Sequence, residues 1–338
     1  MTVNPAGTPD PAADAPLDAL LPGARRIVNV CVGVQPGENV LVVTDPARPA
    51  DVAAALARAS EEAGASTTLM VMPLVPSGAE PPKPVAAAMA AANVILAPTS
   101  GALYHTQSLR DALAQGARFL ALTGFIKDVL VRGGVFADFP ALAPRALALA
   151  ERLTAANVAR VTAPGGTDLR VRLDGRRAVP ITGLARQPGQ ADACPDIEAF
   201  IAPLETSAEG IIVADASASI VGVLDRPLTI TVESGRAVAI EGDDAATAIR
   251  DALDAAGGGD AYTLAELAFG LNPEGIIRGV IVEDEGVAGT GHIALGRNVS
   301  FGGTSAAAIH LDFVFHRPTL WLDDELVIQD GELIESPS

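Results

Sequence analysis

The stretch that decides the fold of the first half of the chain is Val40-Leu41-Val42-Val43-Thr44-Asp45-Pro46, an unbroken apolar run that ends in a turn. Three similar runs follow it, each separated from the next by a helical segment rich in alanine: Thr68–Met72, Val94–Ala97 and Phe119–Leu122. Apolar runs without alternation, with helices between them, are typical of parallel strands that are covered on both faces. Residues 17–156 are therefore predicted to form a doubly wound, Rossmann-like α/β domain.

The loops after these runs lack the motifs of nucleotide-binding proteins. No GxGxxG follows the first run, and GxxxxGK[ST] occurs nowhere in the chain. Both motifs wrap backbone N–H groups around phosphates, so their absence argues against a nucleotide. We expect no nucleotide cofactor in spite of the Rossmann-like layout.

The second half of the chain has a different pattern. Its apolar runs are short and often alternate with polar residues, and Ser234-Gly235 predicts a hairpin between Leu228–Val232 and Ala237–Ile240. Asp243 is expected to cap a helix from Ala245 to Ala256. Residues 157–338 are thus predicted to be an α+β domain of mostly antiparallel strands. Residues 1–16, rich in Ala, Pro, Asp and Thr, are predicted to be a disordered tail.

The composition excludes several classes of protein. A net charge of −18 disfavours nucleic acid as a partner, because phosphates require a basic surface. There is no long uncharged apolar run that predicts a membrane span. Cys31 and Cys194 form no CxxC motif and are expected to be buried thiols in a reducing, cytoplasmic compartment.

Histidine is the informative residue, because the chain has only four. His310 and Asp312 lie two apart in an apolar, strand-like run, so their side chains share one face about 7 Å apart. A buried carboxylate requires a cation or strong donors, and a metal ion held together with His310 would provide one. The alternative is a hydrogen-bonded His–Asp pair in the core. His292, between Gly291 and Gly296, adds a second imidazole and favours the metal.

Two acids also stand out from apolar surroundings. Glu266 is the only charge between Leu264 and Gly270, and Glu198 precedes an apolar segment that ends at Pro203. Isolated acids of this kind are frequently exposed edge residues. Their alternative role is to complete a metal site or to act as a general base.

Taken in order, these residues resemble the metalloaminopeptidases of peptidase family M29, the aminopeptidase T and S group. The family's elements are matched in order by Pro195-x-x-Glu198-x-Phe200, Glu266-x-x-x-Gly270-x-Asn272, the His-Ile-Ala-Leu-Gly segment at 292–296, and His310-x-Asp312. The resemblance implies that Glu198, Glu266, His292, His310 and Asp312 bind divalent metal, either one or two ions of Zn, Co or Mn. It also implies homo-oligomers.

The chain also resembles the iron(II) 2,5-dihydroxypyridine 5,6-dioxygenases. They share the His-x-Asp element, a late Leu322-Asp323-Asp324 and a segment similar to 205–210. Those enzymes have a His ligand at the position of Glu266 and lack counterparts of Glu198 and His292. The resemblance gives a catalytic meaning to His105, which follows the third apolar run and corresponds to a His in the dioxygenases.

The sequence thus leads first to a metal-dependent hydrolase that cleaves an amide or N-terminal peptide bond with metal-activated water. Glu198 or Glu266 is the expected base, and His105 a further catalytic residue. The alternative is a non-haem iron(II) dioxygenase that opens a hydroxylated pyridine. A third interpretation is a binding module that has lost its chemistry. The expected partner is a small molecule or short peptide, with no nucleic acid and no membrane.

Overall fold

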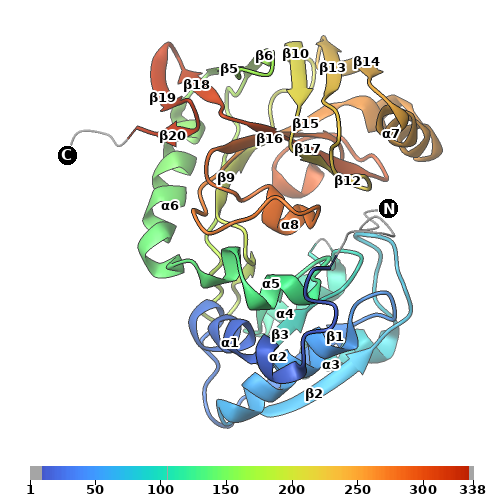
Figure 1. The fold of residues 1–338 in the computed structure, drawn as a ribbon, viewed down its shortest axis with the longest axis vertical. Coiled ribbons are helices and arrows are strands. Elements are labelled where there is room, and N and C mark those ends of the chain that lie inside the picture. The colour runs from blue at the N-terminus through green and yellow to red at the C-terminus, as the bar shows by residue number, and fades with distance from the viewer. Residues whose placement is uncertain (1–9, 105, 335–338) are drawn as a thin grey trace.

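The computed structural model describes residues 10–104 and 106–334, which form two lobes stacked along the long axis of the molecule (Figure 1). The lower lobe in that view contains a parallel sheet with strand order β2-β1-β3-β4-β8. Its strands are β1 (Asn39–Thr44), β2 (Ser66–Val71), β3 (Val94–Ala97), β4 (Arg118–Ala121) and β8 (Ala191–Ala193). The first four strands correspond to the apolar runs of the sequence.

Helices cover both faces of this sheet, because its central strands have apolar side chains on both sides. Val42 of β1 faces a core built with α1 and α2, while Val43 faces a second core built with α3 and α4. The predicted doubly wound arrangement is confirmed. The helices of this lobe are α1 (Leu17–Arg26), continued by the π-helical turn η1 (Ile27–Cys31), α2 (Ala50–Glu62), α3 (Lys83–Ala91), α4 (Gln107–Ala114) and α5 (Lys127–Val131).

The fifth strand, β8, comes from beyond residue 156, where the sequence predicted the second domain to begin. It pairs in parallel with β4, with Ala191 opposite Phe119. Its central residue, Asp192, is buried and accepts hydrogen bonds from the backbone and hydroxyl of Thr182. A domain boundary at residue 156 would therefore assign β8 to the second domain, although it is part of the sheet of the first. The apolar runs missed this strand because an acid occupies its middle.

Part of the predicted disordered tail has a defined structure. Residues 10–16 form turns, and the carboxylate of Asp10 accepts hydrogen bonds from the backbone N–H groups of Lys127 (2.9 Å) and Asp128 (3.1 Å) at the start of α5. Residues 1–9 lie outside the described residues. An acid at a helix N-terminus satisfies unpaired N–H groups, which explains why this segment is ordered.

The upper lobe contains two sheets, and α6 (Phe139–Ala155) runs up to it from the lower lobe (Figure 1). The first, sheet B, has the strand order β14-β13-β10-β6-β5-β18-β19-β20. Its strands are β5 (Val158–Thr162), β6 (Asp168–Arg172), β10 (Glu209–Ala214), β13 (Leu228–Glu233), β14 (Arg236–Glu241), β18 (Thr319–Leu322), β19 (Glu325–Gln329) and β20 (Glu332–Leu333).

The second, sheet C, has the strand order β12-β11-β17-β16-β15-β9-β7. Its strands are β7 (Val179–Ile181), β9 (Glu198–Ile201), β11 (Ser217–Ala218), β12 (Gly222–Val223), β15 (Leu264–Gly270), β16 (Thr290–Gly296) and β17 (His310–His316). The paired strands of sheets B and C are antiparallel, as predicted.

The remaining helical segments are η2 (Gly134–Phe136), α7 (Asp244–Ala255), η3 (Gly259–Tyr262), α8 (Ile281–Asp284) and η4 (Val299–Phe301). The predicted hairpin at Ser234-Gly235 joins β13 to β14, and Asp243 caps α7 by accepting a hydrogen bond from the N–H of Ala245. Both predictions are confirmed. Cys31 and Cys194 are buried free thiols, also as expected.

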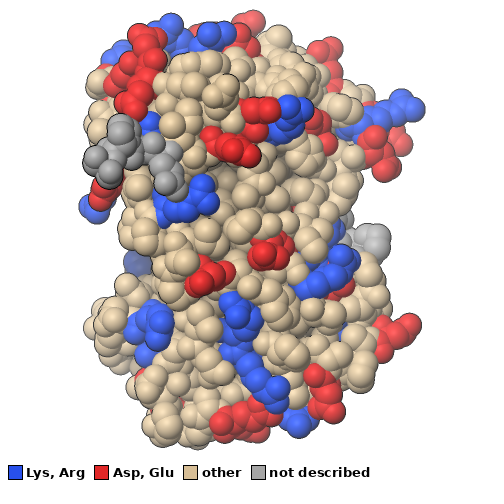
Figure 2. Space-filling model, turned by 60° about the vertical axis from the view of Figure 1, so that its left-hand side comes forward, with Lys and Arg blue, Asp and Glu red and all other residues tan. Residues whose placement is uncertain are grey.

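The surface of the molecule mixes charges of both signs. On the face drawn in Figure 2, acidic and basic side chains are interspersed with wide uncharged areas in both lobes and at the narrower region between them. Within residues 10–104 and 106–334, no helix has the length and apolar character needed to cross a bilayer.

Buried charges connect the two lobes. Arg278, just before α8, reaches Asp128 of α5, and its Nε lies 2.8 Å from Glu283 of α8. Glu283 also accepts a hydrogen bond of 2.8 Å from the N–H of Gly134. The side chains of Arg278, Asp128 and Glu283 are at most 7% exposed. One guanidinium therefore neutralises an acid from each lobe.

We expect Arg278→Ala to lower the free energy of unfolding by about 3–5 kcal/mol, because it leaves two carboxylates buried without their cation. Urea denaturation measures this loss. Arg172→Ala is the matched control: it removes an arginine whose pair with Asp174 lies on the exposed surface, so its effect should be small. Equal losses in the two variants would show that the contact between the lobes does not depend on Arg278.

Candidate metal centre

The candidate site occupies one face of sheet C, and its position follows from strict alternation along the strands. Leu267, Ile293 and Phe313 point to the buried apolar core of the upper lobe. Their neighbours Glu266 and Asp312 point to the opposite face, because successive strand residues alternate between faces. The register aligns Glu266, Ala294 and Asp312 in one row across β15, β16 and β17.

Further residues of the same face complete the site. His292 is two residues before Ala294 on β16, and His310 two before Asp312 on β17, so both point the same way. Glu198 of β9 is opposite Gly270, which lies on this face of β15. The residues between these polar side chains are Ala268, Ala294 and Gly270. These small residues separate the polar side chains, and the backbone of residues 285–287 packs directly against Gly270, which brings Glu285 towards this face.

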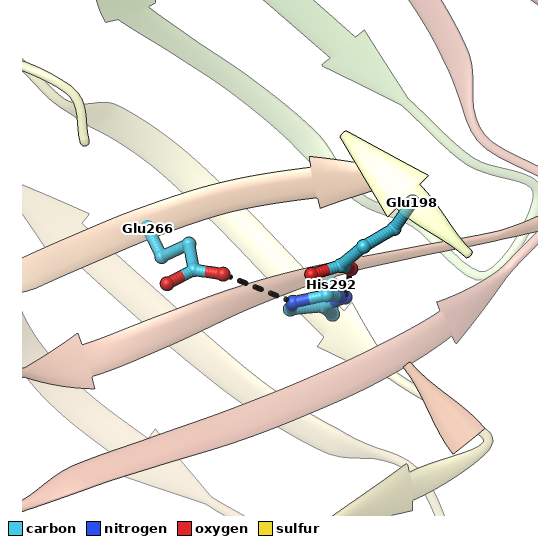
Figure 3. Close-up of side chains that lie close together, drawn as sticks. All are labelled: Glu198, Glu266 and His292. Atoms are coloured by element: carbon cyan, nitrogen blue, oxygen red, sulfur yellow. Dashed lines mark hydrogen bonds and ion pairs between the residues drawn. The ribbon is translucent and has the colours of Figure 1, made fainter. Parts of the chain in front are cut away.

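Figure 3 shows Glu198 and Glu266 reaching His292 from two strands. The distance from His292 Nε2 to Glu266 Oε1 is 3.4 Å, and that from His292 Nδ1 to Glu198 Oε2 is 3.7 Å. Nδ1 of His292 and Oε2 of Glu198 are buried and have no hydrogen-bond partner among the described residues. A cation bound between them would satisfy both atoms, so these residues fit a metal.

His310 and Asp312 are held by contacts behind them. Nδ1 of His310 lies 2.8 Å from the carbonyl oxygen of Arg297, so the N–H donates there and Nε2 faces the site. Nε2 is 3.1 Å from Asp312 Oδ1 and 3.5 Å from Glu266 Oε2. Ser219 Oγ donates to the other oxygen of Asp312 at 3.0 Å. Supporting hydrogen bonds of this kind orient metal ligands.

The structure adds two acids that the sequence analysis missed. Glu285, directly after α8, lies with His292 and Asp312 in a group whose ligand atoms are within 4.8 Å of one another. Asp196 is buried two residues before Glu198, and its charge is among the causes that raise the pKa of Glu198. The sequence signal for Glu285 was the run Glu283-Asp284-Glu285 before Gly286, in otherwise apolar surroundings.

The buried acids change one another's protonation. Burial, and then the charge of Asp196, raise the pKa of Glu198 well above its usual range. Burial and the charge of Asp312 do the same to the pKa of Glu285. Burial lowers the pKa of His310, but the charge of Asp312 and the hydrogen bond to it outweigh this and raise the pKa to about 10. Without a metal, the cluster therefore holds protons at neutral pH.

The structure brings together the predicted metal ligands Glu198, Glu266, His292, His310 and Asp312. Two imidazoles with several carboxylates suit a divalent first-row metal. His105, predicted to be catalytic, lies outside the described residues. Its neighbour Thr106 caps α4 by accepting a hydrogen bond from the N–H of Leu109.

Comparison with known proteins gives a family. The model of the NicX family, described as 2,5-dihydroxypyridine 5,6-dioxygenase, matches residues 21–335. A curated 2,5-dihydroxypyridine 5,6-dioxygenase of Pseudomonas putida is 27% identical over 202 residues. That alignment spans 56% of this chain and 58% of the relative, so it includes little more than half of the relative's length.

Solved structures share the fold over nearly the whole chain. The 2,5-dihydroxypyridine dioxygenase of Pseudomonas putida KT2440 has a TM-score of 0.80 at 20% identity, covering 95% of this chain and 99% of that one. AmpT of Thermus thermophilus has a TM-score of 0.68 at 18% identity, covering 94% of this chain and 99% of its own. The resemblance to both families is thus confirmed, for the aminopeptidase at the level of the fold.

We expect Glu266→Gln to weaken binding of divalent metal at least about tenfold, because Glu266 contacts both His292 and His310 and its charge is lost. Titration of metal-free protein with Zn²⁺ or Fe²⁺ measures the affinity. Glu274→Gln, which changes an exposed acid four residues after Gly270, should leave it unchanged. Equal affinities in the two variants would remove Glu266 from the ligand set.

We also expect metal binding to release at least about one proton, because Glu198 and Glu285 have raised pKa values and a cation displaces their protons. The sign follows: metal affinity falls as the pH is lowered and rises as the pH is raised. Calorimetric titration in buffers of different ionisation enthalpy counts the protons. Glu285→Gln should release fewer protons than the wild type, and binding without proton release in the wild type would contradict the prediction.

Proposed function

The chain belongs to the 2,5-dihydroxypyridine 5,6-dioxygenase family, and from this premise we propose that it is an iron(II)-dependent enzyme that opens the ring of a hydroxylated pyridine. The observation that carries the proposal is the buried cluster of two imidazoles and several carboxylates, in which Glu198 Oε2 and His292 Nδ1 lack partners among the described residues. The family name describes addition of dioxygen at the 5,6 bond of a dihydroxypyridine. We propose a dihydroxypyridine as the substrate class of this chain.

In this proposal His292, His310, Glu266 and Asp312 hold the iron. Bound iron(II) would supply the redox chemistry with dioxygen that ring opening requires. The contact from His310 to the carbonyl of Arg297 fixes the ring orientation, so that Nε2 stays available to the metal. We assign to Glu198 the role of a base: its carboxylate lies 3.7 Å from His292 and, once bound metal has displaced its proton, it can accept a proton from a substrate hydroxyl.

Hydrolysis of an amide is the second candidate function, and one observation favours it. The acids outnumber the imidazoles, and they form two groups that share His292: Glu198 with Glu266, and Glu285 with Asp312. Carboxylate-rich sites suit hydrolysis by metal-activated water. The sequence alone put hydrolysis first. The match to the dioxygenase family reverses that order, because the likeness to AmpT extends only to the fold.

The substrate proposed for both functions is small: a ring for the oxygenase, an amide or short peptide for the hydrolase. The cytoplasmic location inferred from the sequence stays a prediction; the sulfur atoms of Cys31 and Cys194 lie 3.8 Å apart. A homo-oligomer stays a prediction, which light scattering on the purified protein tests.

The functional test compares metals on one preparation of metal-free protein. Loaded with iron(II) without oxygen and then given 2,5-dihydroxypyridine and air, the protein should consume about one O₂ per ring opened, as a dioxygenase must. Loaded with zinc, cobalt or manganese, it should not hydrolyse aminoacyl amides. Amide turnover without substrate-dependent oxygen consumption would reject the oxygenase and support the hydrolase. Glu266→His, which installs the imidazole found in the dioxygenases, should retain oxygen consumption with iron.

A further inference from the structure

Among the site residues on sheet C, His310 has the most exposed side chain. Its side chain is 30% exposed, whereas those of Glu198, Glu266 and Asp312 are at most 7% exposed and that of His292 is fully buried. A substrate that reaches the cluster from solvent therefore first meets the groups that surround the ring of His310.

Phe301 borders the ring of His310, and Phe200 packs against Phe301. Phe301 of η4 meets His310 edge-on, with ring centroids 6.0 Å apart, and meets Phe200 of β9 in the same way at 5.1 Å. Phe200 is two residues after Glu198 and so shares the site face of sheet C. Strands β15 and β16 lie between β9 and β17 in the sheet order. Phe301, which touches residues of both outer strands, must therefore lie above the part of the sheet that carries Glu266 and His292.

The segment that carries Phe301 is held in place rather than free to swing. Asn298, at its start, receives a hydrogen bond from Ser305 N (2.8 Å) and donates to the carboxylate of Glu205 (3.2 Å). Gly303 packs so closely on Asn298 that an added Cβ would lie 2.0 Å from its side-chain oxygen. The same segment supplies the Arg297 carbonyl that orients His310. The ring of Phe301 is thus positioned together with the ligand that it covers.

We propose that Phe301 and Phe200 form the wall against which the substrate ring packs, and that this wall selects flat aromatic rings over saturated rings of the same size. Both phenylalanines are partly exposed, so each retains ring surface for a further contact. Aromatic rings attract one another at centroid distances of about 4.5–7 Å, whereas a puckered saturated ring cannot follow that geometry. The inference rests on the proposed function, because it assigns a ring substrate to the same site. The inference concerns substrate specificity: Phe301 contacts the substrate ring, whereas the ligand residues hold the metal.

The test measures binding to zinc-loaded protein, which needs no turnover. Calorimetry compares hydroquinone with cyclohexane-1,4-diol, a neutral aromatic and saturated pair of the same ring size, in the wild type and in Phe301→Ala. The wild type should prefer the aromatic ring, and Phe301→Ala should lose about 3- to 10-fold in affinity for it, with little change for the saturated ring. Phe301→Tyr should retain the preference. Val299→Ala, on the same turn, is the matched control and should behave as the wild type.

Zinc affinity, measured on the same proteins, should stay unchanged in Phe301→Ala, which separates loss of the wall from disturbance of His310. The proposal is overturned if the wild type shows no preference for the aromatic ring, if Phe301→Ala weakens both rings equally, or if it weakens neither. The proposed function fails differently. In that case iron-loaded wild type consumes no oxygen, whatever the ring preference of the zinc form.

Discussion

Glu198, Glu266, Glu285 and Asp312 bring their carboxylates into a space where His292 and His310 are the described imidazoles. This excess of acid, which is buried except at the partly buried Glu285, constrains the rest of the upper lobe. An ionised carboxylate away from water costs several kcal/mol unless a proton or a cation neutralises it. Protons can neutralise Glu198 and Glu285, because the pKa values of both carboxyl groups are raised. A divalent metal can neutralise the acids instead of protons. It would also bind Glu198 Oε2 and His292 Nδ1, which have no hydrogen-bond partner among the described residues.

The architecture separates this polar cluster from the core by the two faces of sheet C, and the segment around α8 connects it to the lower lobe. Three consecutive acids have three different tasks. Glu283 binds Arg278 and thereby Asp128 of the lower lobe, Asp284 accepts hydrogen bonds from the N–H groups of Arg278 and Gly279, and Glu285 faces the site. The contact between the lobes and the position of one candidate ligand thus depend on the same short run of chain.

The sequence predicts those elements in which local pattern and tertiary environment agree. The strands β1 to β4 were recognisable because both of their faces are buried, and the site residues of β16 and β17 because polar residues interrupt an apolar alternation. β8 was missed because Asp192 is buried and accepts hydrogen bonds from Thr182 and from nearby backbone N–H groups, contacts that no local pattern reveals. Glu285 was missed for a related reason: three acids in a row are typical of an exposed surface, and the contacts of Glu283 and Asp284 with the segment around Arg278 are not visible in the local pattern. The alternative prediction was that His310 and Asp312 form a hydrogen-bonded pair in the core. It did not include Glu266, which lies close to both His292 and His310 in the structure.

The geometry around His292 bears on how many cations the site can use. The two ligand groups share this one residue: Glu198 and Glu266 form one group with it, and Glu285 and Asp312 form the other. A single nitrogen binds a single cation, so filling both groups through His292 puts the cations on opposite sides of its ring. Hydrolases with two metals hold them roughly 3.5–4 Å apart, bridging the reacting oxygen. An imidazole between two cations separates them by more than that, because the ring itself lies between them. The shared histidine therefore cannot hold two cations as close together as a two-metal hydrolase does. A second cation at that spacing would have to use His310, whose Nε2 lies 3.5 Å from Oε2 of Glu266.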